Sequence, residues 1–414
     1  MRPSVTYGWA SPIRLRRAFA RPVRAPPYAP LPTPEPAPPR VAFALLGDVT
    51  GSSRALRQVR ALAETGVDVR VLQVGASREP AALRGVDVTC APWPAGRGPA
   101  LFWRAHRLVR RMAAAHPADL YFASDLYVLP ALAQAARRHG GRLVYDSREL
   151  YAALDSSAGR PWVSAAWRAV ERRHIGRADA VLTVGDAIAD RLAQAYRIDR
   201  PTVLYNAPEV PGAERATPPP TPRSPLLGPD DGRLVVLYQG LLRAGRGLPA
   251  LVEGARRVPD VRLVVIGEGD LGDDLARGGA ALGDRFALHP FVPPDALARV
   301  TPGADLGACL IEPHTESLRL SLPNKLFEYL AAGVPVLASP LPEIRRVVDQ
   351  GVGVLADPDD PAAVAAALRR ALDPGARAGW ASRTRDVLEP YAWNHGRRTF
   401  NALIRDLLDR PAPA

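Results

Sequence analysis

Two segments in the second half of the chain carry residue types that could bind a diphosphate. The first is Gly240-Leu-Leu-Arg-Ala-Gly-Arg-Gly-Leu248, which places Arg243 and Arg246 between an apolar run and a predicted helix. Arginine side chains and the free amide groups of a helix N-terminus both stabilise a bound dianion. The segment therefore predicts a diphosphate site at Gly240, Arg243 and Arg246. An ordinary basic loop is the alternative interpretation.

The second segment, residues 320–339, contains Lys325, the only lysine among the 54 basic residues of the chain. Pro323 and Asn324 begin a predicted helix, in which Lys325 and Glu328 share one face because they are three residues apart. A lysine binds phosphate as a point charge, and a carboxylate accepts hydrogen bonds from the hydroxyls of a ribose. A surface Lys–Glu pair is the alternative. The single lysine in an arginine-rich chain favours nucleotide binding by Asn324, Lys325 and Glu328.

Other patterns that carry chemistry are weak or missing. Gly267-Glu-Gly-Asp-Leu-Gly272 has the spacing of a dinucleotide-binding loop, but it follows the second strand of its half and precedes two acidic residues. Gly267 stays a candidate binding residue because a glycine lets the backbone approach a ligand closely. The chain has no P-loop, no G-x-S-x-G motif and no histidines at metal-ligand spacing. We therefore expect no cofactor and no metal.

Apolar runs that alternate with amphipathic stretches predict the elements that position these residues. In the first half, strands are predicted at 41–46, 67–74, 119–123, 142–146, 180–184 and 202–205, and helices at 54–65, 101–115, 129–139, 162–175 and 186–196. In the second half, strands are predicted at 234–239, 262–266, 285–288, 305–311, 334–338 and 353–355, and helices at 248–257, 294–301, 324–332, 342–349, 361–372 and 393–408. This alternation predicts an α/β fold with two doubly wound Rossmann-like domains that face each other across a cleft. In such sheets ligands bind outside the carboxyl ends of the strands.

Composition divides the chain further. Of 414 residues, 44 are prolines, the net charge is +12, and residues 1–40 hold seven arginines against one acid. A segment of this kind buries too little apolar surface to become ordered, so residues 1–40 are predicted to be a disordered basic arm. Residues 208–232 are predicted to be a proline-rich linker between domains at 41–207 and 233–388, and residues 389–414 a C-terminal helix.

Partners and compartment are also constrained by composition. The chain shows no apolar run near the ~18 residues that span a membrane and no secretory signal, and its two cysteines make no disulfide framework, so a cytoplasmic protein is expected. Residues 101–112 and 162–173 mix arginines with tryptophan, which predicts peripheral binding to an anionic membrane surface. Helices that pack these aromatics on the sheet are the alternative. No nucleic-acid partner is expected.

Over residues 41–405 the sequence resembles the retaining GT-B glycosyltransferases of family 4. The resemblance rests on Tyr238-Gln-Gly240 with the arginines that follow it, Val264-Val-Ile-Gly-Glu-Gly269, and Phe327-Glu-Tyr-Leu-Ala-Ala-Gly-Val-Pro-Val336. It implies that the first domain binds an acceptor, that the second binds a nucleotide-sugar donor, and that the last helix crosses back to the first domain.

The resemblance also implies roles for residues of the second domain. Glu328 matches the second glutamate of the family's E-x7-E motif, which holds the nucleotide ribose. Arg246 lies where the family has a lysine on the diphosphate, and Arg243 is expected to replace the family's arginine. The first glutamate of the motif is Leu320 in this chain, so Glu316, or Glu312, is the expected substitute.

In the first domain, the residue that matches the family's histidine after the fourth strand is Arg148. Arg148 and Glu316 are therefore the candidate catalytic residues. Gly51, Ser52 and Ser53 match the glycine-rich loop that lies near the diphosphate and the acceptor.

The implied activity is transfer of a sugar from a nucleotide-diphosphate sugar to the hydroxyl of a saccharide, a lipid-linked compound or a small molecule, with retention and without a metal. Two alternatives stay open. One is a nucleotide-sugar epimerase of the same fold. The other is a non-catalytic partner subunit that has lost the glutamate at Leu320.

Overall fold

The computed structural model describes residues 37–75, 83, 85–96, 98–154, 159–210 and 223–410. Residues from Pro38 onward form one unit. Most of the predicted arm at 1–40, and residues 211–222 of the predicted linker at 208–232, lie outside the described residues, so both stay predictions.

The first half of the chain forms a parallel sheet in the order β3-β2-β1-β4-β5-β6-β7. Its strands are β1 (Arg40–Leu46), β2 (Asp68–Val74), β3 (Asp87–Ala91), β4 (Leu120–Ala123), β5 (Arg142–Ser147), β6 (Ala180–Thr183) and β7 (Thr202–Val203). The inner strand β1 is a continuous apolar run after Arg40, because helices cover both of its faces. The parallel, doubly wound arrangement predicted for this half is therefore confirmed.

The second half forms a separate parallel sheet in the order β10-β9-β8-β11-β12-β13. Its strands are β8 (Leu234–Gln239), β9 (Val261–Ile266), β10 (Phe286–His289), β11 (Leu306–Cys309), β12 (Val336–Ala338) and β13 (Gly353–Leu355). Strand order reverses between β8 and β11, so the carboxyl end of β8 is a topological switch point, where open α/β sheets bind ligands.

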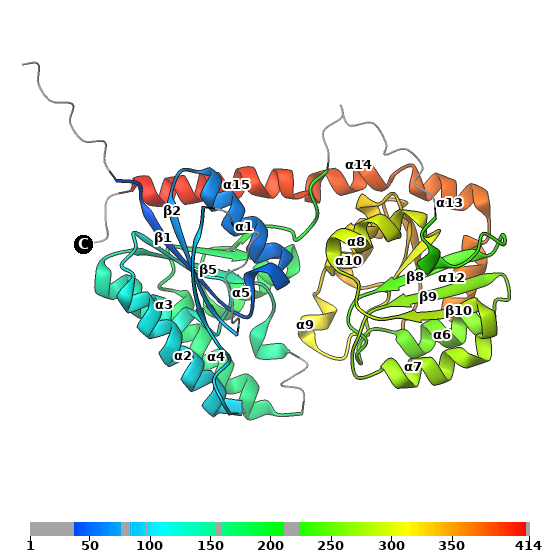
Figure 1. Cartoon of the computed structure of the whole chain (residues 1–414), viewed down its shortest axis with the longest axis horizontal. Helices are drawn as coiled ribbons and strands as arrows, with labels where there is room; N and C mark the ends of the chain where they lie inside the picture. Colours follow the sequence, from blue (N-terminus) through cyan, green and yellow to red (C-terminus); the bar gives the residue numbers. More distant parts are fainter. Residues whose placement is uncertain are drawn as a thin grey trace, which may run out of the picture. The chain divides into compact units, whose positions relative to one another are not determined.

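Helices cover both faces of the first sheet (Figure 1). One face packs on α2 (Gly98–Ala115), α3 (Leu129–His139), α4 (Pro161–Ile175) and α5 (Asp186–Tyr196). The other face packs on α1 (Ser53–Glu64) and on α15 (Trp393–Asp409), the last helix of the chain. Phe400 of α15 lies with its ring centroid 5.9 Å from that of Phe122 in β4. Helix α15 is therefore part of the core of the first domain.

The second sheet is covered in the same way. One face packs on α6 (Leu248–Arg256), α7 (Gly272–Gly279), α12 (Pro361–Ala371) and α13 (Pro374–Ala381). The other face packs on α8 (Pro294–Val300), α9 (Glu316–Arg319), α10 (Asn324–Ala331), α11 (Pro342–Val348) and α14 (Thr384–Leu388). The chain therefore forms two doubly wound domains, as the alternating pattern predicts.

Several elements were not predicted from the sequence. Strand β3 lies at the edge of the first sheet, and its last four residues are only half-buried, so it lacks the long apolar run that marks the inner strands. Helix α7 has two glycines among its eight residues, which weakens its helical pattern.

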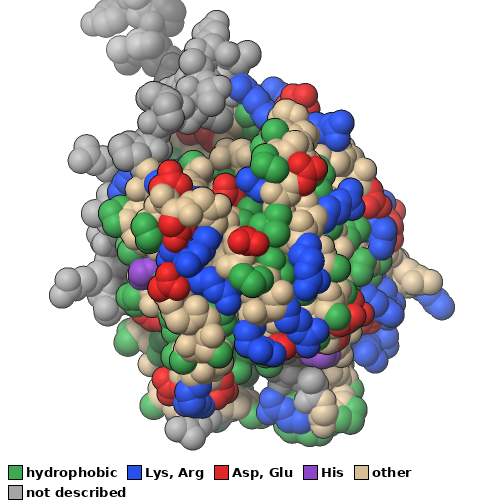
Figure 2. Space-filling model, turned by 90° about the vertical axis from the view of Figure 1, so that its right-hand side faces the viewer, with side chains coloured by type: hydrophobic (Ala, Val, Ile, Leu, Met, Phe, Trp, Pro, Cys, Tyr) green, Lys and Arg blue, Asp and Glu red, His purple; other side chains and the backbone are tan. Residues whose placement is uncertain are grey.

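One face of the molecule carries charges of both signs. Figure 2 shows a face of the molecule on which lysine or arginine side chains are interspersed with acidic ones. Among the helices of the described residues, none has the length and apolar character needed to cross a membrane.

Candidate functional site

Lys325 lies in the first turn of α10 and reaches the carboxyl end of β8. Its Nζ is 3.6 Å from the centroid of the Tyr238 ring, and a Cβ built on Gly240 would lie 3.4 Å from the same atom. Burial lowers the pKa of Lys325 to about 7. The positive charges of Arg246 and Arg243 also lower this pKa, whereas the negative charge of Glu328 raises it. The predicted group of Gly240, Arg243, Arg246 and Lys325 is therefore close enough to interact at one sheet end.

Glu328 is held at the same sheet end by a chain of polar groups. Its carboxylate accepts a hydrogen bond from the side-chain amide of Gln239 at 2.7 Å, and Gln239 in turn accepts one from the Thr301 hydroxyl at 3.0 Å. The next residue of α10, Tyr329, donates its hydroxyl to the Leu237 carbonyl at 2.9 Å. These contacts fix α10 against β8 and orient the carboxylate of Glu328. Asn324 begins α10, and its side chain is exposed.

The arginine loop that precedes α6 is held by Glu312. The carboxylate of Glu312 accepts a hydrogen bond from the backbone N–H of Gly247 at 2.7 Å, and its own N–H donates to the Gly245 carbonyl at 3.2 Å. Glu312 also pairs with His314. With Asp359, these two side chains form a group, among the described residues, whose ligand atoms lie within 4.8 Å of one another. Glu312 therefore supports the loop that carries Arg243 and Arg246.

Gly267 has a packing role that its motif did not reveal. A Cβ at this position would lie 1.9 Å from the Gly240 carbonyl oxygen, and Gly267 has a φ of +153°. Only a glycine allows the loops after β8 and β9 to approach this closely. This contact explains the residue without a ligand, and its place in donor binding stays a prediction.

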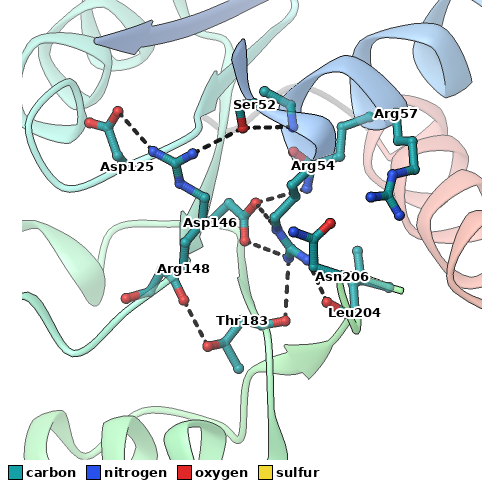
Figure 3. Close-up of polar contacts among 12 residues, drawn as sticks. Ser52, Arg54, Arg57, Asp125, Asp146, Arg148, Thr183, Leu204 and Asn206 are labelled. Carbon is teal, nitrogen blue, oxygen red and sulfur yellow. Dashed lines mark hydrogen bonds and ion pairs between the residues drawn. The ribbon is translucent and has the colours of Figure 1, made fainter. Parts of the chain in front are cut away.

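Arg148 lies at the carboxyl end of β5 in the first domain (Figure 3). Its guanidinium donates to the Ser52 hydroxyl at 3.2 Å and lies 3.6 Å from the carboxylate of Asp125. Although burial disfavours the charge, Tyr151 and Asp125 raise the pKa of Arg148. Ser52 is also the N-cap of α1, accepting from the Ala55 N–H at 3.3 Å. The predicted Arg148 and Ser52 are therefore in direct contact.

A buried arginine network beside Arg148 was missed from the sequence. Arg54 of α1 binds the Asp146 carboxylate through two hydrogen bonds of 2.7 Å (Figure 3). Gln58 donates to the same carboxylate at 2.8 Å. Arg54 is 3% exposed and also donates to the carbonyls of Thr183 and Leu204. The available signal was an acid at the end of a predicted strand, but its arginine is 92 residues away.

Arg57, one turn after Arg54 on α1, was also missed. It donates to the Ser53 carbonyl at 3.0 Å and to the Ala207 carbonyl. Burial and the charge of Arg54 lower the pKa of Arg57 to about 10, and Glu328 opposes them. Glu328 of α10 therefore lies close enough to Arg57 of α1 for its negative charge to raise the pKa of that arginine. Gly51 ends the short 3-10 turn η1 (Val49–Gly51), and it is exposed, as is Ser53.

Glu316 and Leu320 both face the first domain. The Glu316 carboxylate accepts from Arg191 of α5 at 2.7 Å and lies 4.0 Å from Arg319. Leu320 packs against the apolar core of the first domain. The position of the family's first glutamate therefore makes an apolar contact between the domains, and the candidate substitute Glu316 is engaged in an ion pair with Arg191. The catalytic role predicted for Glu316 stays a prediction.

Two family descriptions match the chain. Residues 50–208 match "Glycosyl transferase 4-like domain", and residues 232–374 match "Glycosyl transferases group 1". Each match includes one of the two sheet ends described above.

Relatives and solved structures point to the same group. A D-inositol 3-phosphate glycosyltransferase of Xylanimonas cellulosilytica is 30% identical over 54% of this chain and 56% of its own length. A 2-deoxystreptamine glucosyltransferase of Streptomyces kanamyceticus is 29% identical over 77% of this chain and 88% of its own. The matched region thus spans only about half the length of the first of these relatives.

Among solved structures, a sucrose-phosphate synthase from Thermosynechococcus elongatus superposes with a TM-score of 0.71 at 16% identity, over 89% of this chain and 99% of that one. Anabaena HepE in complex with UDP-glucose superposes with a TM-score of 0.68 at 16% identity, over 89% of this chain and all of that one. These likenesses show a shared fold. Taken with the two family matches, they show that the chain belongs to the GT-B glycosyltransferases of family 4, with a glycosyl transferase 4-like domain followed by a group 1 domain.

Proposed function

We propose that the protein transfers a glycosyl group from a nucleotide-diphosphate sugar to an acceptor hydroxyl, with retention of configuration. The observation that carries the proposal is the cation cluster at the carboxyl end of β8, where Lys325 lies against Tyr238 and Gly240 and within electrostatic reach of Arg243 and Arg246. Positive charge at this point stabilises a diphosphate both when it is bound and when it departs as the leaving group. This chemistry needs no protein nucleophile.

Each side chain of the cluster has a distinct part in the proposal. Arg243, Arg246 and Lys325 bind the diphosphate, and the Glu328 carboxylate accepts hydrogen bonds from the ribose hydroxyls. One oxygen of Glu328 already accepts from the amide of Gln239 at 2.7 Å, and the other is the proposed acceptor for the ribose. Arg148, held between Ser52 and Asp125, adds a positive charge from the first domain. We expect no cofactor and no metal in the reaction.

The experiment that tests the proposal is a donor screen. The purified chain is titrated with UDP, GDP, ADP and dTDP by calorimetry, and the corresponding sugar nucleotides are then tested for release of the nucleotide with and without acceptors. Selective binding of one nucleoside diphosphate and acceptor-dependent release are the expected results. Binding without any release or transfer would instead favour the non-catalytic partner subunit, since Leu320 replaces an acid. The family members named above are glycosyltransferases, and nothing in the site favours an epimerase.

The acceptor side of the proposal includes an anionic membrane surface. Helices α2 and α4 pack together through Phe102 and Trp167, whose ring centroids are 5.0 Å apart, and leave Trp103 and Trp162 about three-fifths exposed. Helix α2 has no acidic residue, and the only acid of α4, Glu171, is buried and accepts from Tyr145 and Tyr196. The exposed side of this helix pair is therefore cationic and aromatic, which suits an anionic bilayer surface.

Vesicle co-sedimentation tests the membrane contact. The full chain is expected to bind vesicles that contain phosphatidylglycerol more strongly than neutral vesicles, and high salt should weaken this binding. Replacing Trp103 and Trp162 by alanine should reduce it, whereas Phe291→Ala, at an equally exposed aromatic of the second domain, should not. Equal binding of vesicles by all variants would show that the membrane contact does not involve Trp103 and Trp162. A cytoplasmic location is consistent with Cys90 and Cys309, which form no disulfide within the described part of the chain, and we propose no nucleic-acid partner.

A further inference from the structure

The loops that follow β8, β11 and β13 meet at one point of the second domain. The first is the arginine loop, which ends at Gly247, and the other two contain Leu310 and Pro358. A Cβ built on Gly247 would lie 2.5 Å from the Cβ of Leu310 and 3.3 Å from the Cβ of Pro358. Strand ends that are distant in the sequence therefore bring their loops into close contact here.

The loops after β11 and β13 supply side chains that can bind a metal ion. Glu312 and His314 come from the first of these loops, and Asp359 comes from the second. An imidazole nitrogen of His314 and one oxygen of each carboxylate all lie within 4.8 Å of one another. Ligand atoms lie ~2.0–2.2 Å from a Zn²⁺ ion, so those around one ion are about 3–4 Å apart. Small adjustments of these side chains then place an ion among them.

These side chains are available to an ion from solvent. Among the described residues, the carboxylate of Asp359 makes no hydrogen bond or ion pair, and His314 pairs only with Glu312. One oxygen of Glu312 accepts from the Gly247 N–H at 2.7 Å, and the other lies 2.5 Å from Nε2 of His314. An ion replaces the second contact and leaves the first in place. Since His314 and Asp359 are exposed, water can complete the coordination.

We propose that Glu312, His314 and Asp359 bind a divalent transition-metal ion of the zinc type. An imidazole nitrogen suits Zn²⁺ and similar ions, whereas Mg²⁺ and Ca²⁺ prefer oxygen ligands alone. The two carboxylates balance the charge of a divalent ion. The histidine therefore distinguishes this group from a patch of surface acids and determines which ions it selects.

The bound ion has a structural role. It joins the loop that carries Asp359 to the loop that carries Glu312, and Glu312 in turn holds the arginine loop at Gly247. No step of the proposed glycosyl transfer passes through the ion, so the inference goes beyond that function and does not depend on it. The sequence did not reveal the group because Asp359 lies far along the chain from His314, and the seven histidines show no metal-ligand spacing.

Calorimetric titration of the full chain with zinc chloride, in the absence of nucleotide, tests the proposal. After removal of metals with EDTA, the chain should bind Zn²⁺ at least about tenfold more tightly than Mg²⁺. His314→Ala and Asp359→Asn should each weaken Zn²⁺ binding by about tenfold or more, because each removes a ligand. His395→Ala is the matched control. His395 also pairs with an acid, Glu389 at 3.4 Å, but no further ligand completes a group with them among the described residues.

Thermal unfolding provides a second measurement on the same proteins. An ion that binds the folded chain raises its Tm. Zn²⁺ should therefore raise the Tm of the unaltered chain and of His395→Ala, but not that of His314→Ala or Asp359→Asn. Without Zn²⁺ all of these proteins should unfold at similar temperatures, which checks that the variants fold. Glu312 is left unchanged because its loss would release the Gly247 N–H and alter the arginine loop directly.

Equal affinity for Zn²⁺ and Mg²⁺ would overturn the proposal, as would Zn²⁺ binding that is unchanged in His314→Ala. A loss of binding in His395→Ala as large as that in His314→Ala would show non-specific binding to surface histidines and would also overturn it. Because these titrations contain no nucleotide, failure of the proposed glycosyl transfer would not change their outcome. A chain that transfers sugar but binds no Zn²⁺ would refute the metal site alone.

Discussion

Cationic side chains lie at the carboxyl ends of both sheets, but they differ in whether they pair with carboxylates of the protein. In the first domain, Arg54 is buried in a two-bond ion pair with Asp146, and Arg148 lies beside the buried Asp125. In the second domain, no ion pair with a carboxylate is found for Lys325 or Arg243 among the described residues, and Glu328 is occupied by the amide of Gln239. The charge of Arg54 is thus neutralised within the protein, whereas the second sheet end keeps positive charge that a ligand can neutralise.

This difference separates two uses of the same residue type. A buried cation with a matched acid holds elements together, because removing either partner leaves an uncompensated charge. Desolvation lowers the pKa of a buried cation that has no such acid, as it does for Lys325. Such a cation favours the binding of an anion from solvent. The comparison predicts that substitutions of the Arg54–Asp146 pair change stability and that substitutions at the second sheet end change affinity for the donor.

The largest expected effect is on stability, at Asp146. Asp146→Ala leaves Arg54 buried without its carboxylate, and this should lower the free energy of unfolding by about 3–5 kcal/mol. Urea denaturation measures the change. Glu253→Ala, which removes the exposed partner of Arg256 and Arg257, is the matched control and should change stability much less, because solvent screens an exposed ion pair. Similar losses of unfolding free energy in the two variants would show that the Arg54–Asp146 pair has no special structural role.

The next effect is on donor affinity. Lys325→Ala and Arg246→Ala should each weaken binding of the selected nucleoside diphosphate by about 2 kcal/mol, the loss of a charge-assisted contact. Neither should lower stability as Asp146→Ala does. Calorimetry measures the affinity, and Arg256→Ala, at an exposed arginine away from the cluster, is the control. Unchanged affinity in both variants would show that the diphosphate does not bind at this sheet end.

The pH dependence of donor binding sharpens the role of Lys325. Its pKa of about 7 in the free protein means that the amine is largely neutral above this pH. A bound diphosphate favours the protonated amine, so binding above pH 7 takes up a proton. Affinity should therefore fall as pH rises from 7.5 to 9.5, by at most about tenfold per pH unit. The slope should disappear in Lys325→Met. A slope that survives this substitution would assign the titration to another group.

The smallest effect is expected at Glu328. Glu328→Ala should weaken nucleoside diphosphate binding by about 1–1.5 kcal/mol, and Glu328→Gln by less, because the amide oxygen still accepts a hydrogen bond. The unaltered chain should also prefer the ribonucleotide over its 2′-deoxy analogue, and Glu328→Ala should lose this preference. If the preference persists in Glu328→Ala, the carboxylate serves to hold Gln239 rather than the ribose.

Much of the fold was predictable because its signals are local. Runs such as Val41–Leu46 and Leu234–Gln239 are continuous and apolar, which marks inner strands of a parallel sheet. The edge strand β3 and the glycine-containing α7 lack such signals and were missed. The cluster at the end of β8 could also be predicted from the sequence, since Lys325 and Glu328 share a helix turn and the arginine loop directly follows a strand.

The sequence by itself determined the two doubly wound domains and the residues that gather at the end of β8. Only the tertiary structure decided the pairing of Arg54 with Asp146, the ion pair of Arg191 with Glu316, and the contact of Leu320 with the core of the first domain. The physical reason is the sequence separation over which each kind of interaction acts. Hydrophobic periodicity and capping act over a few residues, whereas Arg191 and Glu316 are 125 residues apart and meet only once both sheets and their helices have packed.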